Sequence, residues 1–115
     1  MTPSLFALCS AEPLDVPAFY AAINAGADPN IGGRSKNILV IDQLSPLMAL
    51  MLRRDPDPAA EWVQALIDAG ARVGERSPHY GLTALILAAA WNQVDAVQVL
   101  LAAGANPDAV SSEHR

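Results

Sequence analysis

The chain has 115 residues, of which 52% are hydrophobic and 17% charged, and its formal net charge is −5. This length allows one domain or one short array of repeats, and it excludes a two-domain enzyme with a separate cofactor domain. The acidic balance, with 7 Lys+Arg against 12 Asp+Glu, lacks the basic footprint that general nucleic-acid binding requires.

The first segment predicts two short helices. Ser4 precedes an apolar run that contains the single cysteine, Cys9, and a serine in that place can cap a helix by accepting a bond from a free backbone N–H. A second apolar run ends at Gly26-Ala27, where glycine is suited to a left-handed helix stop. With one cysteine no internal disulfide can form, and we expect Cys9 to be a buried structural thiol.

A long loop follows from about residue 31 to residue 43. Gly32-Gly33 begins it, and a short apolar stretch from Ile38 to Ile41 comes later. We interpret the glycine pair as a turn rather than a phosphate-binding loop, because it lacks the remaining residues of such a motif. The loop is therefore predicted to form a hairpin finger.

The second and third segments repeat the pattern of the first. Ser45-Pro46 and Thr83 open apolar runs, and further apolar runs end at Gly70-Ala71 and Gly104-Ala105. The three Gly-Ala pairs lie 44 and 34 residues apart. The last segment predicts helices over 84–90 and 94–103, with Asn92 in a left-handed turn between them.

This pattern resembles the ankyrin repeat. The family's unit opens with Gly-x-Thr-Pro-Leu-His-x-Ala-Ala and closes with Leu-Leu-x-x-Gly-Ala-Asp-x-Asn, and the stretches Gly81–Ala89 and Val97–Asn106 match these motifs. Ser45-Pro46-Leu47 and Gly26–Asn30 match them in the other segments. The resemblance implies an all-α ankyrin-repeat solenoid of about three helix-turn-helix units with hairpin-like loops. We place the units at about 2–31, 43–75 and 81–109, the finger loop at 31–43 and a tail at 110–115, in one domain.

Stacking of neighbouring units is expected to supply most of the stability. The motif's histidine, which ties neighbouring units by hydrogen bonds, is replaced by Met48 and Ile86, so we expect apolar contact to substitute for it. Unit three has no following unit to cover it, and we expect the tail to cover it in part, a homodimer being the alternative. The predicted core contains Leu47, Leu50, Val63, Leu66, Ile67, Leu85, Val97, Leu100 and Leu101, with Trp62 in or near it.

Catalytic and metal-binding patterns are sparse. The two histidines, His79 and His114, have no Cys/His spacing that fits a zinc site. A small hydrolase that uses His79 with an acid such as Glu75 is an unfavoured alternative, because no second catalytic partner is evident. We therefore expect no enzyme activity, no cofactor and no metal.

The resemblance implies a concave partner-binding face made of hairpin tips and first helices. Arg34, Lys36, Arg53 and Arg54 map to that side, so an acidic protein is expected to display a basic and aromatic groove there. Trp91 is the side chain most expected to bind, since tryptophan often dominates interface energies. The alternative is that it packs on the turn or on the Pro-rich insertion of unit two. The full predicted set is Trp91, Tyr80, His79, Leu82, Leu52, Arg53, Arg34, Lys36 and Leu44.

The function predicted from these features is non-catalytic binding of one protein partner. Two alternatives stay open: an immunity or inhibitor protein that neutralises a neighbouring gene product, and an effector that acts on host proteins. The composition suggests a bacterial source. No signal peptide or membrane span is recognised, so a cytoplasmic location is expected, with secretion as an effector left open, and a monomer is favoured over a homodimer.

Overall fold

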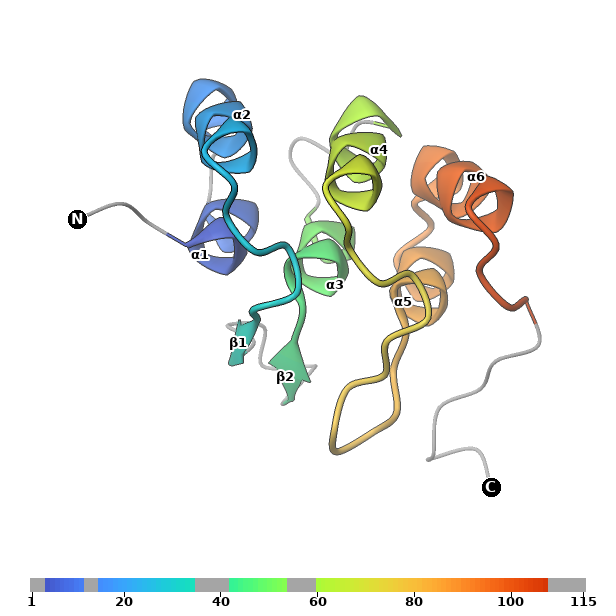
Figure 1. Ribbon diagram of the computed structural model, residues 1–115. Helices are drawn as coiled ribbons and strands as arrows, with labels where there is room; N and C mark the ends of the chain where they lie inside the picture. Colours follow the sequence, from blue (N-terminus) through green and yellow to red (C-terminus); the bar gives the residue numbers. More distant parts are fainter. Residues whose placement is uncertain (1–3, 12–14, 35–41, 54–59, 108–115) are drawn as a thin grey trace.

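Three helix pairs follow one another in the computed structural model (Figure 1). The structure describes residues 4–11, 15–34, 42–53 and 60–107. Two short strands, β1 (Gly33–Arg34) and β2 (Gln43–Leu44), pair antiparallel between the first and second helix pairs. This mostly helical arrangement confirms the predicted helical-repeat fold. The pairs are α1 (Leu5–Ser10) with α2 (Val16–Asn24), α3 (Pro46–Met51) with α4 (Ala60–Asp68), and α5 (Ala84–Ala90) with α6 (Val94–Ala102).

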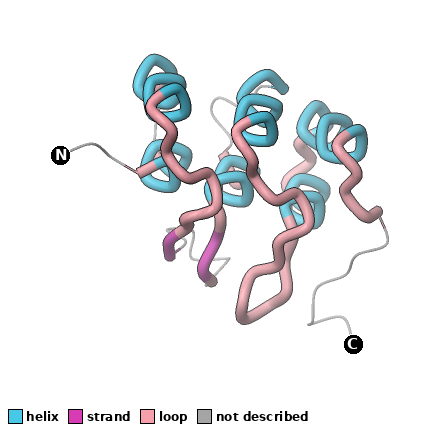
Figure 2. The backbone as a smooth tube through the Cα atoms, in the orientation of Figure 1, coloured by secondary structure: helices cyan, strands magenta, loops and turns pink. Residues whose placement is uncertain are grey.

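The helices form two rows. An inner row contains α1, α3 and α5, and an outer row contains α2, α4 and α6 (Figure 1). In the inner row α3 packs against both neighbours, whereas in the outer row α4 packs against α6 more closely than against α2. The loops that connect the pairs extend away from the inner row as fingers (Figure 2).

The inner helices are capped at their starts as the sequence predicts. Each cap oxygen accepts a hydrogen bond from the backbone N–H three residues further on, at 3.1 to 3.2 Å. Pro46 occupies the start of α3, where its missing N–H has no intrahelical partner to lose. The capping residues of the inner helices are Ser4, Ser45 and Thr83.

The outer helices end as predicted, in left-handed glycines. At the end of α4 the Gly70 N–H donates to the Ile67 carbonyl at 3.0 Å, and the Ala71 N–H donates to the Leu66 carbonyl at 3.0 Å. These bonds satisfy carbonyls that the helix leaves free. Asn92 adopts φ 58° after α5, also as predicted. The three glycines are Gly26, Gly70 and Gly104, at φ 86°, 107° and 96°.

The core confirms most of the predicted residues and corrects one. Ile67 and Val97 are half-buried at its edge, and Cys9 is fully buried, which raises the pKa of its thiol to about 12 despite the nearby charge of Arg53. Leu101 is 44% exposed, so its placement in the core was wrong; its neighbour Leu100 takes the inward direction instead. The confirmed core residues are Leu47, Leu50, Val63, Leu66, Leu85 and Leu100, with Trp62 buried beside them.

The glycine pair of the finger makes two close approaches. A Cβ on Gly32 would lie 2.0 Å from the carbonyl oxygen of Leu44, and a Cβ on Gly33 would lie 2.7 Å from the ring of Phe6. Only glycine allows backbone and ring to come this near. The pair therefore seats the base of the finger against β2 and α1, which supports its interpretation as a structural turn.

Polar side chains tie each unit to the next. The Arg53 guanidinium, which is 2% exposed, donates through Nη1 to the carbonyl of Cys9 at 3.0 Å and to that of Ala11. Gln93 Nε2 donates to the carbonyl of Met51 at 3.2 Å and to that of Arg53. The expectation that apolar contact alone replaces the missing histidine is therefore incomplete.

A third tie joins the loops of the first two units. The Asn30 side chain donates to the carbonyl of Gly70 at 3.0 Å and accepts from the N–H of Arg72 at 2.9 Å. One amide thus satisfies both a donor and an acceptor of the following unit, which holds the two loops in register.

Candidate functional site

A buried carboxylate joins the two fingers. Asp42 lies immediately before β2 and is 3% exposed. Its Oδ1 accepts from the N–H of Gln43 at 2.8 Å and of His79 at 3.1 Å, and its Oδ2 accepts from the N–H of Tyr80 at 3.0 Å. The tip of the second finger, residues 77–81, is therefore held against the base of the first.

The hydrogen bonds also control the ionisation of Asp42. Burial alone raises the pKa of the carboxyl, but the bond from the Ser77 side chain and those from the N–H groups of Tyr80, Gln43 and His79 outweigh it. The pKa of Asp42 consequently lies below its ordinary value of 3.8. The group is a carboxylate at neutral pH and stabilises the folded state in that form.

The second finger is closed by its own bonds. The Ser77 N–H donates to the carbonyl of Leu82 at 2.8 Å, and the Leu82 N–H donates to the Ser77 hydroxyl at 2.9 Å. Arg76 Nη1 donates to the carbonyl of Gly81 at 2.9 Å. The finger therefore presents its tip residues from a closed loop.

Two predicted binding residues share one cavity between the fingers. Arg34 on β1 and His79 on the second finger line a cavity of about 200 Å³, together with Asp42 and Gln43. Both Arg34 and His79 are exposed. Residues that are 45 positions apart in the chain thus meet at the surface, over the carboxylate that joins their loops.

The remaining accessible residues of the predicted set are half-buried. Tyr80 and Leu82 belong to the second finger, whereas Leu52 and Trp91 follow the C-terminal ends of α3 and α5. Leu52, Leu82 and Trp91 all pack against the core. Trp91 is thus partly exposed and partly packed against the core.

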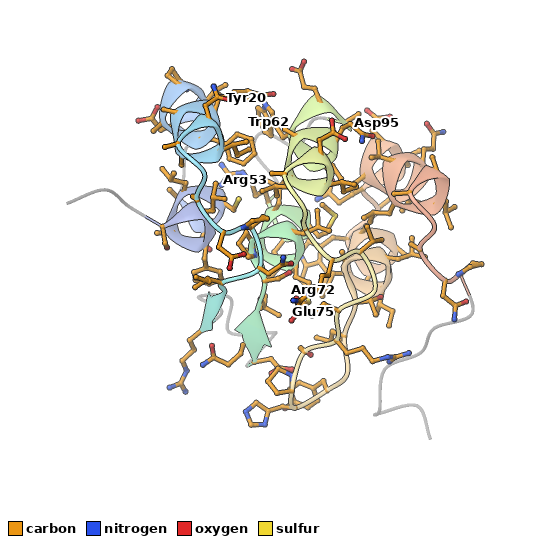
Figure 3. All side chains as sticks on the ribbon, viewed as in Figure 1. Tyr20, Arg53, Trp62, Arg72, Glu75 and Asp95 are labelled. Atoms are coloured by element: carbon orange, nitrogen blue, oxygen red, sulfur yellow. The ribbon has the colours of Figure 1, made fainter. Side chains whose placement is uncertain are left out.

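Two predicted binding residues are buried instead. Arg53 is 2% exposed and donates to carbonyls of the first unit, as Figure 3 shows by its place inside the stack. Leu44 is also 2% exposed, because β2 turns it inward beneath the finger. The prediction that these side chains are displayed was wrong. Lys36 and Arg54 lie outside the described residues, so Arg34 is the basic residue of the predicted groove that the described part displays.

The two residues of the hydrolase alternative line different cavities. Glu75 lines a cavity of about 170 Å³ under the first finger, which is separate from the cavity that His79 lines. The acid and base of the hydrolase alternative therefore do not share a cavity. Within the described ranges we find no cluster of three metal-ligating side chains. Likewise, none of the helices described has the length and apolar character needed to cross a membrane.

Sequence reasoning missed Asp42 and Gln43. The signal was present, since Asp42 is the one acidic residue in the run from Ile38 to Leu44, where Gln43 is the only other polar residue. An acid in such a run is costly to bury unless hydrogen bonds satisfy it. It therefore marks a buried carboxylate with several donors.

We expect Asp42→Asn to destabilise the protein by about 1–3 kcal/mol at pH 7, because an amide offers one acceptor oxygen where the carboxylate uses two. The folded-state pKa of Asp42 is lowered, so its contribution is complete above pH 3.8 and is lost as the pH falls through the folded-state value. Urea denaturation of both proteins across this range should show the difference shrinking in acid.

The exposed Asp95 on α6 provides the matched control for this prediction. Asp95→Asn should change the free energy of unfolding by about 0.5 kcal/mol or less at pH 7. An Asp42→Asn protein as stable as the wild type would show that the carboxylate does not hold the fingers together.

Comparison with known proteins agrees with this geometry. A family model described as ankyrin repeats (3 copies) matches residues 8–111. The chain matches none of the curated proteins with which it was compared. The family match begins within α1 and covers the other five helices and both fingers.

Proposed function

Because the chain belongs to the ankyrin-repeat family, we propose that it is a non-catalytic adaptor that binds one protein partner through its fingers and inner helices. Ankyrin repeats are generally protein–protein interaction modules. The proposed contact set is Arg34, His79, Tyr80, Leu82, Leu52 and Trp91, with Lys36 beyond the described residues.

The observation that carries this proposal is the cavity between the two fingers. Arg34 and His79 reach it from separate loops, and the Asp42 carboxylate joins those loops by hydrogen bonds. Loops held in place before binding lose less conformational freedom when a partner arrives. Arg34, Tyr80 and Trp91 are also of the residue types that contribute most of the binding energy at protein interfaces.

We expect Trp91→Ala to weaken partner binding by about 2 kcal/mol. The partner would first be captured from the source organism with the wild-type protein and identified, and its Kd then measured by calorimetry. Since Trp91 also packs against the core, the melting temperature of the variant must be recorded alongside. Arg34→Ala is the second variant, because Arg34 is exposed and its removal should leave the fold unchanged.

Gln98→Ala, an exposed change on α6, is the control for both variants and should leave the Kd unchanged. If Trp91→Ala and Arg34→Ala both bind like the wild type, the partner uses another surface and the proposal fails. If Trp91→Ala unfolds the protein while Arg34→Ala keeps full affinity, Trp91 is structural and the proposed surface is again wrong.

A further inference from the structure

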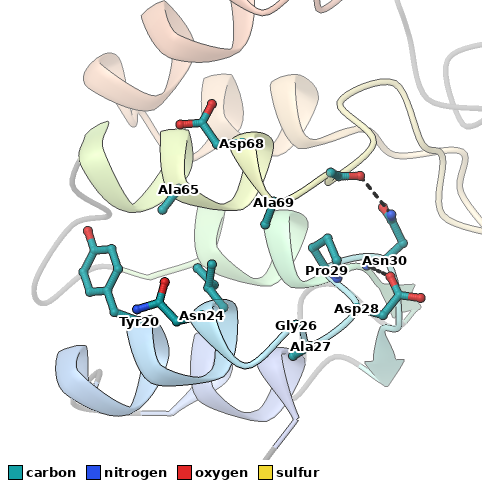
Figure 4. Close-up of a pocket in the computed structure, with 12 residues that line it drawn as sticks. Tyr20, Asn24, Gly26, Ala27, Asp28, Pro29, Asn30, Ala65, Asp68 and Ala69 are labelled. Carbon is teal, nitrogen blue, oxygen red and sulfur yellow. Dashed lines mark hydrogen bonds between the residues drawn. The ribbon is translucent and has the colours of Figure 1, made fainter.

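A groove separates α2 from α4 on the outer row of helices. Figure 4 shows it between the first and second units. It has a volume of about 650 Å³ and is lined by both helices and by the loop from Gly26 to Asn30. The corresponding helices of the next step, α4 and α6, pack closely. The groove therefore belongs to the first step of the stack.

Small side chains leave this space open. Ala65 lies on α4, and Ala69 directly follows the last residue of that helix. The two are four positions apart, so they lie on the same side, and both line the groove. On the opposite side Ala27 and Ile23 line it. The face of α4 that buries Leu66 belongs to the core instead. The floor of the groove is therefore shallow and apolar.

The rim of the groove is acidic. Asp28 and Asp68 line it from opposite sides, and no lysine or arginine is among its described lining residues. Each carboxylate is oriented by a hydrogen bond: Asp28 Oδ1 accepts from the Asn30 N–H at 2.9 Å, and Asp68 Oδ1 accepts from Gln64 Nε2 at 2.8 Å. Both residues are exposed, so the remaining carboxylate oxygens can accept bonds from an incoming cation.

We propose that this groove binds a short peptide segment of a protein partner that places a large apolar side chain on the alanine floor and lysine or arginine on the acidic rim. The floor favours apolar contact, and the two carboxylates favour positive charge on either side of it. The outer row carries this groove, whereas the proposed adaptor surface lies on the fingers and inner row. One protein can therefore hold two partners, or two parts of one partner.

The test uses a synthetic 12-residue amphipathic peptide of leucine and lysine as the probe, with the same peptide carrying glutamate for lysine as its comparison. The lysine peptide is titrated into the full chain and followed by NMR. It should shift the amide resonances of Ile23, Ala27, Ala65 and Ala69. The glutamate peptide should bind at least tenfold more weakly. Higher salt should weaken the binding of the lysine peptide.

Two pairs of variants locate the contact. Ala65→Lys places a long cation on the floor and should weaken the lysine peptide at least tenfold, whereas Gln98→Lys, the same charge change on α6, should alter its Kd less than twofold. Asp68→Asn should weaken it about threefold, and Asp95→Asn should leave it unchanged. Trp91→Ala should also leave it unchanged, which separates this site from the proposed adaptor surface.

Three results would overturn the inference. If Gln98→Lys and Asp95→Asn lowered the affinity as much as Ala65→Lys and Asp68→Asn, binding of the lysine peptide would depend on the net charge of the protein and not on the groove. Equal affinity for the two peptides would mean that the rim carboxylates do not contribute to recognition of the peptide. Light scattering that shows a dimer broken by Ala65→Lys would mean that a second copy of this chain occupies the groove.

Discussion

Arg53→Ala is expected to destabilise the protein by about 3 kcal/mol or more. The substitution removes a side chain that is 2% exposed and leaves the carbonyls of Cys9 and Ala11 without the donor that reaches them from the second unit. A cavity and carbonyls left without their donor both lower stability. The free energy of unfolding should be measured by urea denaturation at pH 7.

Arg34 is the matched control, because it is an arginine with an exposed side chain on β1. Arg34→Ala should change the free energy of unfolding by about 0.5 kcal/mol or less. Arg53→Lys should recover only part of the loss, since one ammonium group does not reproduce the planar fork of a guanidinium. If the Arg53→Ala and Arg34→Ala proteins were equally stable, the contacts of Arg53 would not contribute to joining the units.

Leu100→Ala should cost about 2–5 kcal/mol, whereas Leu101→Ala should cost about 1 kcal/mol or less. Leu100 on α6 is fully buried, and Leu101 at the next position of the same helix is 44% exposed. The two substitutions remove the same atoms from adjacent positions, so helix propensity changes equally in both. Thermal and urea unfolding of the pair would measure the difference.

The result that contradicts this prediction is a loss of similar size at both positions. Leu101 would then be covered in solution, by residues beyond Pro107 or by a second molecule. Light scattering over a range of protein concentrations distinguishes those two causes, because only the second depends on concentration.

Local signals were enough to predict the helices and their ends. Ser45 and Thr83 cap inner helices as expected, and Gly70 ends α4 in the left-handed conformation. Each of these features depends on residues within one helical turn. The apolar runs of the three pairs, together with the family motif, predicted that the pairs stack.

The errors concern contacts between units. Arg53 follows the inner helix at a position where the family displays side chains to partners, but here the preceding unit offers two free carbonyls within its reach. Leu101 was placed in the core because the motif pairs it with Leu100, although nothing in the described chain packs beyond α6. In both cases the outcome depends on a neighbouring unit, which the local pattern does not describe.

The candidate site was predicted in part. The family's variable positions led to Arg34 and His79, which the structure brings to one cavity. The same mapping missed Asp42, because that residue lies in the extended finger where the motif has no counterpart. The groove between α2 and α4 was missed as well, since it depends on the spacing of two helices rather than on any motif.

The ties between units also limit how this protein can be re-engineered. Arg53 lies eight residues after its cap Ser45, whereas Gln93 lies ten residues after its cap Thr83, so the two donors occupy different positions of the repeat. A duplicated or transplanted unit would place its donor side chain where it does not face the carbonyls of the neighbouring unit. Extending this array would therefore require redesign of each junction, and its length is not freely adjustable by inserting copies.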